Sequence, residues 1–181
     1  NVGDAEINGF ELDITYLING VTSVTAYFNS NDPTLSEDYY GDEGVLTANA
    51  GNRLSNMPKS SYYLSLDRDI VLMGLPGFLN IDYSFVGDRF STFENVSSGS
   101  DIREVLPSYG LANMRLGVEM DNSIIEAYIS NIADEDGYLS RYDDFAQAGD
   151  PATSGYPGFG IRRTGTKPRV IGIRYRYKLQ L

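Results

Sequence analysis

The chain has 181 residues, with 14 lysines and arginines against 25 aspartates and glutamates, so its formal net charge is −11. This length suits one domain or a part of a larger one. Such an acidic chain lacks the cationic excess that binds nucleic-acid phosphates. The absence of histidine and cysteine excludes zinc fingers, disulfides and histidine-based triads within this chain. No pair of acids is singled out as catalytic by its spacing, and we expect no enzyme activity, cofactor, metal site or nucleic-acid partner.

Apolar and polar residues alternate through most of the chain, and this period of two is typical of β-strands. The alternation predicts seven strands, at residues 5–18, 21–31, 60–71, 78–92, 111–121, 123–132 and 168–181. In the last strand the odd positions from 171 to 181 are apolar, and the even positions include Arg174, Arg176 and Lys178. Only Arg68 interrupts the apolar side of the third strand. In a strand these two sets point to opposite faces.

The connections between the predicted strands alternate between short and long. Tight turns are expected at Asn19-Gly20, around residues 74–77 and at Asn122-Ser123. The long links are 32–59, 93–110 and 133–167. This rhythm places the tight turns at one end and the large loops at the other, as in outer-membrane barrels. An eighth strand could be hidden near residues 44–52, although that stretch alternates poorly.

The alternation alone does not decide which face is buried. A soluble barrel turns its apolar side chains inward, whereas a membrane barrel turns them to lipid around a wet interior. The loop rhythm and the length of the last strand favour the membrane barrel. On this interpretation the tyrosines of the apolar faces form an aromatic girdle at the lipid headgroups. These tyrosines are Tyr62, Tyr83, Tyr175 and Tyr177.

Seven strands leave two unpaired edges, which lipid does not tolerate. We therefore expect an all-β fold in which residues 1–181 form about seven C-terminal strands of a larger antiparallel, up-and-down transmembrane β-barrel. Four segments then carry a resemblance to a known family. They are Gly9–Asp13, Gly51–Lys59, Asn131–Asp134 with Tyr138, and Lys167–Ile173 with Tyr175 and Tyr177. In this order and at these spacings, the chain resembles the C-terminal third of the barrel of a TonB-dependent outer-membrane receptor.

The resemblance implies a receptor of roughly 22 strands with an N-terminal plug inside the barrel. Neither that plug nor the earlier strands are within this sequence. Such a receptor lies in the outer membrane of a Gram-negative bacterium, in contact with lipid and lipopolysaccharide. It would import a scarce ligand, such as a ferric siderophore or another metal chelate. The energy would come from the inner-membrane protein TonB through a box near the N-terminus, which this sequence also lacks.

Two other functions are compatible with the sequence. One is a passive outer-membrane pore or small adhesive barrel, which would have no plug. The other is a soluble β-barrel that binds a small apolar ligand, and which would stay folded without detergent. The sequence does not identify the ligand-binding residues or the ligand.

The sequence also allows predictions for the charged and aromatic side chains of the loops and of the last strand. Six acids against Arg141 between residues 134 and 150 predict a solvated acidic loop rather than a Ca²⁺ site, because the dedicated ligand spacing is missing. Such a loop would disfavour anionic ligands. The cations Arg174, Arg176 and Lys178 could contact a plug or a substrate, but we favour pairing with Glu126. The aromatic residues of the outer loops either contact ligand or pack the loops together. These are Tyr39, Tyr40, Tyr138, Tyr142, Tyr156 and Phe159.

Overall fold

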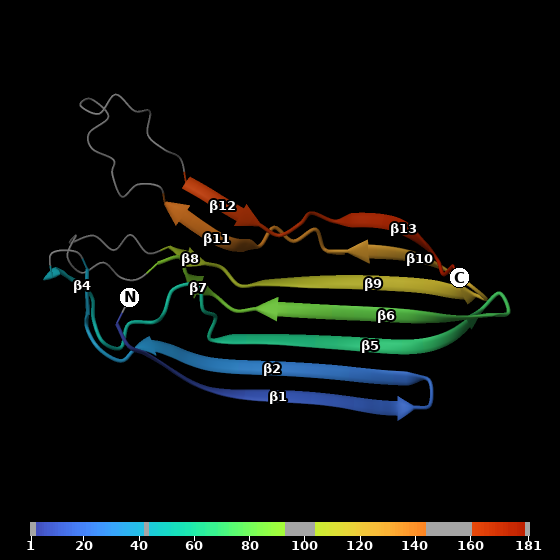
Figure 1. Ribbon diagram of the computed structural model, residues 1–181, viewed down its shortest axis with the longest axis horizontal. Coiled ribbons are helices and arrows are strands. Elements are labelled where there is room, and N and C mark those ends of the chain that lie inside the picture. The colour runs from blue at the N-terminus through green and yellow to red at the C-terminus, as the bar shows by residue number, and fades with distance from the viewer. Residues whose placement is uncertain (1–2, 42–43, 93–103, 144–160, 180–181) are drawn as a thin grey trace, which may run out of the picture.

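The computed structural model describes residues 3–41, 44–92, 104–143 and 161–179. Seven long strands form one antiparallel sheet in which neighbours in the chain are neighbours in space (Figure 1). They are β1 (Ala5–Asn19), β2 (Thr22–Leu35), β5 (Ser60–Leu72), β6 (Leu75–Val86), β9 (Tyr109–Met120), β10 (Ser123–Ser130) and β13 (Val170–Tyr177). All seven predicted strands are confirmed as an up-and-down meander.

Three small two-stranded sheets lie in the long links, at the end of the molecule opposite the tight turns (Figure 1). They pair β3 (Tyr39–Tyr40) with β4 (Leu46–Ala48), β7 (Arg89–Phe90) with β8 (Val105–Leu106), and β11 (Tyr138–Asp143) with β12 (Ile161–Gly165). The possible strand near residues 44–52 exists as β4, but it pairs with β3 outside the main sheet and adds no eighth strand to it. The strand predicted over 78–92 is interrupted after Val86, and β7 belongs to a separate sheet.

The three tight turns lie together at one end of the sheet, as the rhythm of the links predicted (Figure 1). The first is Gly20-Val21, one residue later than predicted, where the Asn19 side chain accepts a hydrogen bond from the Val21 amide at 3.0 Å. The second is Met73-Gly74, with φ of 54° and 79°. Two positive φ angles are those of the hairpin turn whose twist matches the flanking strands.

The third tight turn, Asp121-Asn122, is closed by the pair Met120 and Ser123, one residue earlier than predicted. The end of β13 lies beside it, where the Lys178 amide donates to the Asn122 carbonyl oxygen at 2.7 Å.

The register of the sheet aligns apolar residues with apolar ones across all of its strands. One row on the apolar face runs Tyr16, Val24, Leu66, Ile81, Met114, Ile129 and Ile171. A row on the opposite face runs Thr15, Thr25, Ser65, Asp82 and Asn113. The register also fixes the facing at Tyr27-Phe28: Phe28 lies on the apolar face, and its ring centre is 6.5 Å from that of Phe10.

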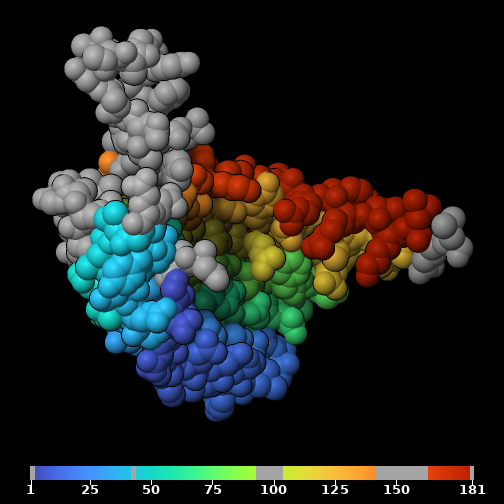
Figure 2. All heavy atoms as spheres, turned by 60° about the vertical axis from the view of Figure 1, so that its left-hand side comes forward, coloured from blue at the N-terminus to red at the C-terminus, as the bar shows by residue number. Residues whose placement is uncertain are grey.

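The burial of the two faces is the reverse of that in a soluble barrel. Ile171, Ile173 and Tyr175 of the apolar face are 71%, 79% and 61% exposed. Away from the loop end, the buried side chains of these strands are polar, among them Glu126 and Asn80. The sheet is strongly curved (Figure 2), and curvature crowds the side chains of the concave face. The interpretation as a soluble barrel with an apolar interior is therefore not supported.

Both edges of the seven-stranded sheet are open within the described part of the chain. β1 pairs with β2 alone, β13 pairs with β10 alone, and every residue of β1 is exposed. Apolar burial is confined to the loop end, where Leu35, Ala48 and Leu106 are at most 2% exposed. Among the described residues, no helix is long and apolar enough to cross a membrane.

Candidate functional site

The polar face of the sheet is the first candidate for function. We call it the polar wall, and its charged and amide side chains include Glu11, Asn29, Asp67, Asn80, Asp82, Asn113, Arg115, Glu119, Glu126, Arg174 and Arg176. Cross-strand hydrogen bonds join β5, β6 and β9. Asn80 donates to Asp67 Oδ1 at 2.7 Å and accepts from Arg115 Nη2 at 2.8 Å and Nε at 3.1 Å. The side chains of the wall are thereby held in fixed orientations.

A second chain of hydrogen bonds connects the polar wall with the loops. Asn113 Nδ2 donates to Asp82 Oδ2 at 2.6 Å, and Asn113 Oδ1 accepts from the Asn131 amide at 2.9 Å. Asn131 directly follows β10 and is 4% exposed. These hydrogen bonds therefore fix the position at which β10 ends and the long loop begins.

The most buried charge of the wall is Glu126 of β10, which is 1% exposed. Its two oxygens accept hydrogen bonds from Arg174 Nη1 at 2.8 Å and from Arg176 Nη2 at 3.3 Å. Both arginines lie on β13, and the Arg174 guanidinium is 5.3 Å from the ring centre of Tyr128. A buried carboxylate requires such partners. The pairing predicted from the sequence is confirmed for these two arginines, while Lys178 forms no ion pair with a described residue.

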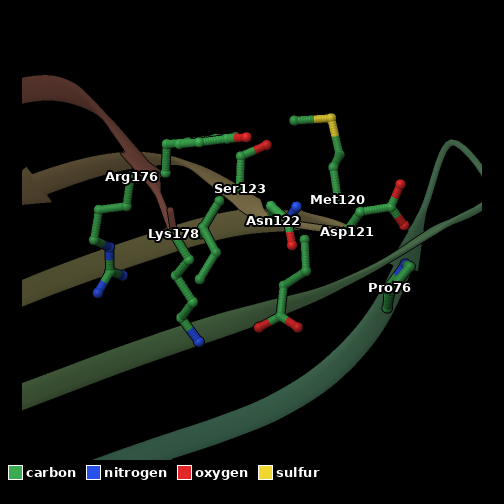
Figure 3. Close-up of a pocket in the computed structure, with 10 residues that line it drawn as sticks. Pro76, Met120, Asp121, Asn122, Ser123, Arg176 and Lys178 are labelled. Atoms are coloured by element: carbon green, nitrogen blue, oxygen red, sulfur yellow. The ribbon is translucent and has the colours of Figure 1, made fainter. Parts of the chain in front are cut away.

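Two of the hollows along this wall are lined by charged side chains. One of about 270 Å³ is bounded by polar side chains that include Asp82, Arg115 and Arg174. The other, of about 620 Å³, lies at the tight-turn end and is lined by Glu119, Asp121, Arg176 and Lys178 among others. In Figure 3 Arg176 and Lys178 extend to the same side of β13, whereas Met120 points the other way. Charges of both signs thus line the wall.

A cluster of arginines at the loop end was not predicted. Arg89 is 7% exposed, donates from Nη2 to the Tyr138 carbonyl oxygen at 2.5 Å, and lies 5.5 Å from the ring centre of Tyr109. Glu104 forms ion pairs with Arg141 and, at 3.5 Å, with Arg163. These residues come from four separate segments, so no pattern in the sequence could have shown that they meet.

The segment Gly51–Lys59, which carried part of the resemblance, ties one long link to two strands. Arg53 donates to Asp88 Oδ2 at 3.0 Å and to the Met57 carbonyl oxygen at 3.0 Å, and it also contacts the Asp88 carbonyl oxygen. Its guanidinium lies 5.3 Å from the ring centre of Phe90. The adjacent Leu54 amide donates to the Pro33 carbonyl oxygen of β2 at 2.9 Å. This Arg53 junction therefore has a structural role.

The segment Asn131–Asp134 has a similar role at the base of the last link. The Asn131 side chain bonds to the backbone of Glu135 in both directions and donates to the Lys167 carbonyl oxygen at 2.9 Å. Asp134 accepts from the Arg169 amide at 2.7 Å. These contacts bring the exit of β10 to the entrance of β13, where the closing segment of the resemblance begins.

The other residues singled out from the sequence have varied outcomes. Asp134 forms an ion pair with Arg169. No group of three or more potential metal ligands occurs among the described residues. The Tyr138 ring packs 5.0 Å from the Arg163 guanidinium, which favours loop packing, whereas Tyr40 is 57% exposed. Asp144, Asp150, Tyr156 and Phe159 lie outside the described residues, as does the side chain of Tyr142.

Comparison with known proteins identifies the class of protein to which this architecture belongs. Residues 1–132 match the family described as "TonB dependent receptor-like, beta-barrel". The chain therefore belongs to that family, whose members are outer-membrane β-barrels of Gram-negative bacteria and act as transport receptors. No curated protein matches the chain.

Solved structures of similar fold cover nearly the whole chain. The ferric yersiniabactin uptake receptor FyuA from Yersinia pestis superposes with a TM-score of 0.71 at 18% identity, over 98% of this chain and 24% of that one. The ferric-catecholate import receptor Fiu from K12 E. coli, in its closed form, gives 0.63 at 15% identity, over 94% and 20%. FpvAI in its complex with pyocin S2 gives 0.63 at 12%, over 96% and 19%. This chain spans about a quarter or less of the length of these proteins.

Proposed function

We propose that this chain forms the C-terminal part of the transmembrane barrel of an active uptake receptor in a Gram-negative outer membrane. The observation that supports this most strongly is the division of the sheet into an exposed apolar face and a hydrogen-bonded polar wall. A closed barrel built this way presents the apolar face to lipid and the polar wall to an aqueous interior. The open edges of β1 and β13 would then be closed by further strands of the same receptor.

The proposed ligand is a ferric siderophore or a similar metal chelate, imported with energy from TonB. Family membership supports the receptor role, and two of the similar structures, FyuA and Fiu, are uptake or import receptors for ferric chelates. A plug inside the barrel and a box that binds TonB would belong to parts of the receptor outside this chain. Lipid and lipopolysaccharide would surround the apolar face.

The test is uptake in cells that produce the complete receptor. We expect a strain without the receptor to lose growth and radioactive-iron accumulation on one class of ferric chelate, and the complete receptor to restore both. A matched strain without TonB should not be restored. If no chelate among catecholate, hydroxamate and mixed types depends on the receptor, the ligand class is wrong.

The passive pore remains the competing function, and the same strains distinguish it. A pore would pass its solute equally with and without TonB, and would conduct ions continuously in a planar bilayer. We expect instead that the complete receptor conducts poorly, because a plug would fill its interior. Uptake that persists at full rate without TonB would contradict the active mechanism.

A further inference from the structure

Arg68 is the single charge within one band of the outward face of the seven strands. This band begins at the row formed by Phe28, Tyr62 and Phe85 and ends at the tight turns. Within it, every other outward-facing residue of the seven strands is uncharged. The register places Arg68 between Thr22 of β2 and Leu79 of β6. Its side chain is exposed and forms no hydrogen bond or ion pair with a described residue. The polar wall, with its carboxylates, lies on the other side of the sheet.

The position of Arg68 along β5 places it toward the tight turns. Six positions separate it from Tyr62, about 20 Å of strand at roughly 3.3 Å per residue. At a tilt of about 40°, this corresponds to about 15 Å of an apolar band roughly 25 Å tall. Only Ile70 and Leu72 face outward between Arg68 and the end of β5. Arg68 therefore lies in the half of the band nearer the tight turns, which are periplasmic in such barrels.

A lone arginine in this place needs an anionic partner. Its methylene stem can stay against the apolar side chains while the guanidinium extends toward the headgroups. The adjacent Thr22 hydroxyl is buried and has no hydrogen-bond partner among the described residues, so a second polar group interrupts the apolar row at this point. A guanidinium binds phosphate oxygens with two parallel hydrogen bonds, which an ammonium cannot do.

We propose that Arg68 binds the headgroup phosphate of a phospholipid in the periplasmic leaflet. This inference rests on the proposed placement of the barrel in a bilayer. The lipid phosphate supplies the charge that the protein does not, and the acyl chains lie along the apolar side chains beside Arg68. One lipid is thereby held at a fixed position on the barrel surface.

The experiment uses the complete receptor, delipidated in detergent, titrated with phosphatidylglycerol and examined by native mass spectrometry. We expect Arg68→Leu and Arg68→Gln to weaken binding of the tightest lipid at least fivefold, and Arg68→Lys to retain part of it. Lys59→Leu is the matched control, because it also removes one exposed cation but at the loop end, beside Asp32. It should leave binding of that lipid unchanged.

A second measurement separates failure of this inference from failure of the proposed function. The same variants are reconstituted into phosphatidylglycerol vesicles, and their thermal unfolding midpoints are compared. A lower midpoint for Arg68→Leu supports the phosphate contact. An equal or higher midpoint, or lipid binding that matches the unaltered receptor, overturns it, because Arg68 would then be only a charge exposed to hydrocarbon. A receptor that does not insert into vesicles at all would overturn the membrane placement itself.

Discussion

At the scale of single residues, the polar wall depends on pairing between neighbouring strands. Glu126 shows this most clearly, because it is almost wholly buried while Arg174 and Arg176 are about half exposed. Removing the acid removes both ion pairs, whereas removing either cation leaves the acid with its other partner. We therefore expect the acid to be the more sensitive member of this group.

Replacing Glu126 with glutamine keeps its size but removes its charge. We expect Glu126→Gln to lower the free energy of unfolding of the complete receptor by about 1–3 kcal/mol, because charge-assisted hydrogen bonds to a buried carboxylate are lost. The measurement is urea unfolding in lipid vesicles. Glu119→Gln, at an exposed position of the same wall, is the control and should change stability by less than about 0.5 kcal/mol. Equal effects of the two substitutions would argue against a special role for Glu126.

The Arg53 junction gives a prediction of a different kind. Arg53→Lys keeps the charge but not the planar group that reaches Asp88 and the Met57 carbonyl oxygen at the same time. We expect limited proteolysis within residues 36–59 to become severalfold faster, while the strands stay intact. Lys59→Arg, in an exposed pair with Asp32 at 3.5 Å, should not change the rate. Unaltered cleavage in Arg53→Lys would show that the junction does not restrain the link.

At the scale of elements, glycines opposite aromatic residues allow the strands to pack side by side. Tyr128 lies across Gly172, and Phe78 lies across Gly117. A Cβ added at Gly117 would be 2.5 Å from the Phe78 ring and 3.2 Å from the Ile125 carbonyl oxygen. The aromatic rings therefore occupy the space that the missing side chains leave.

The close contact at Gly117 can be tested by comparison with Gly20, which has no neighbouring atoms where a Cβ would lie. We expect Gly117→Ala to destabilise the complete receptor by about 1–3 kcal/mol, since the Phe78 ring must move. Gly20→Ala is the control, because nothing lies within 4 Å of its added Cβ. The free energies come from unfolding in vesicles. If both variants unfold like the unaltered receptor, the close approach of Phe78 to Gly117 does not contribute to the free energy of unfolding.

At the scale of the whole molecule, the sequence predicted the sheet because one period of two runs through each strand and keeps its phase. Ile171, Ile173 and Tyr175 share a face with Ile129 and Ile125 of β10 once the strands pair, so alternation and register agree. The pairing of Arg174 with Glu126 could be predicted for the same reason. Both are consequences of a regular repeat.

The loop end could not be predicted in this way. The strands of β3, β7 and β8 have two residues each, too few to show any period. Glu104 meets Arg141 and Arg163 because the link between β6 and β9 lies against the link between β10 and β13, and their separations in sequence carry no signal of it. The first turn lies one residue later than predicted, and there the Asn19 side chain accepts a hydrogen bond from the Val21 amide.

The two faces of the sheet should respond oppositely to charge. We expect Ile173→Lys to destabilise the complete receptor by about 2–4 kcal/mol if this position lies near the bilayer midplane. Ser23→Lys, on the polar wall opposite Asp67, should be tolerated. Folding yield into vesicles gives the comparison, and a larger loss for Ser23→Lys would contradict the assignment of the faces.

The most direct test of the central claim measures what surrounds each face. This chain has no cysteine, so once any cysteine elsewhere in the complete receptor is replaced, spin labels can be placed singly at Ile171, Ile173, Arg174 and Arg176 in vesicles. Electron paramagnetic resonance then compares accessibility to oxygen, which concentrates in hydrocarbon, with accessibility to a water-soluble nickel chelate. We predict that labels at Ile171 and Ile173 meet oxygen and are shielded from the chelate, and that labels at Arg174 and Arg176 do not show this lipid signature. High oxygen accessibility and shielding from the chelate at Arg174 and Arg176, together with the reverse at Ile171 and Ile173, would contradict the account.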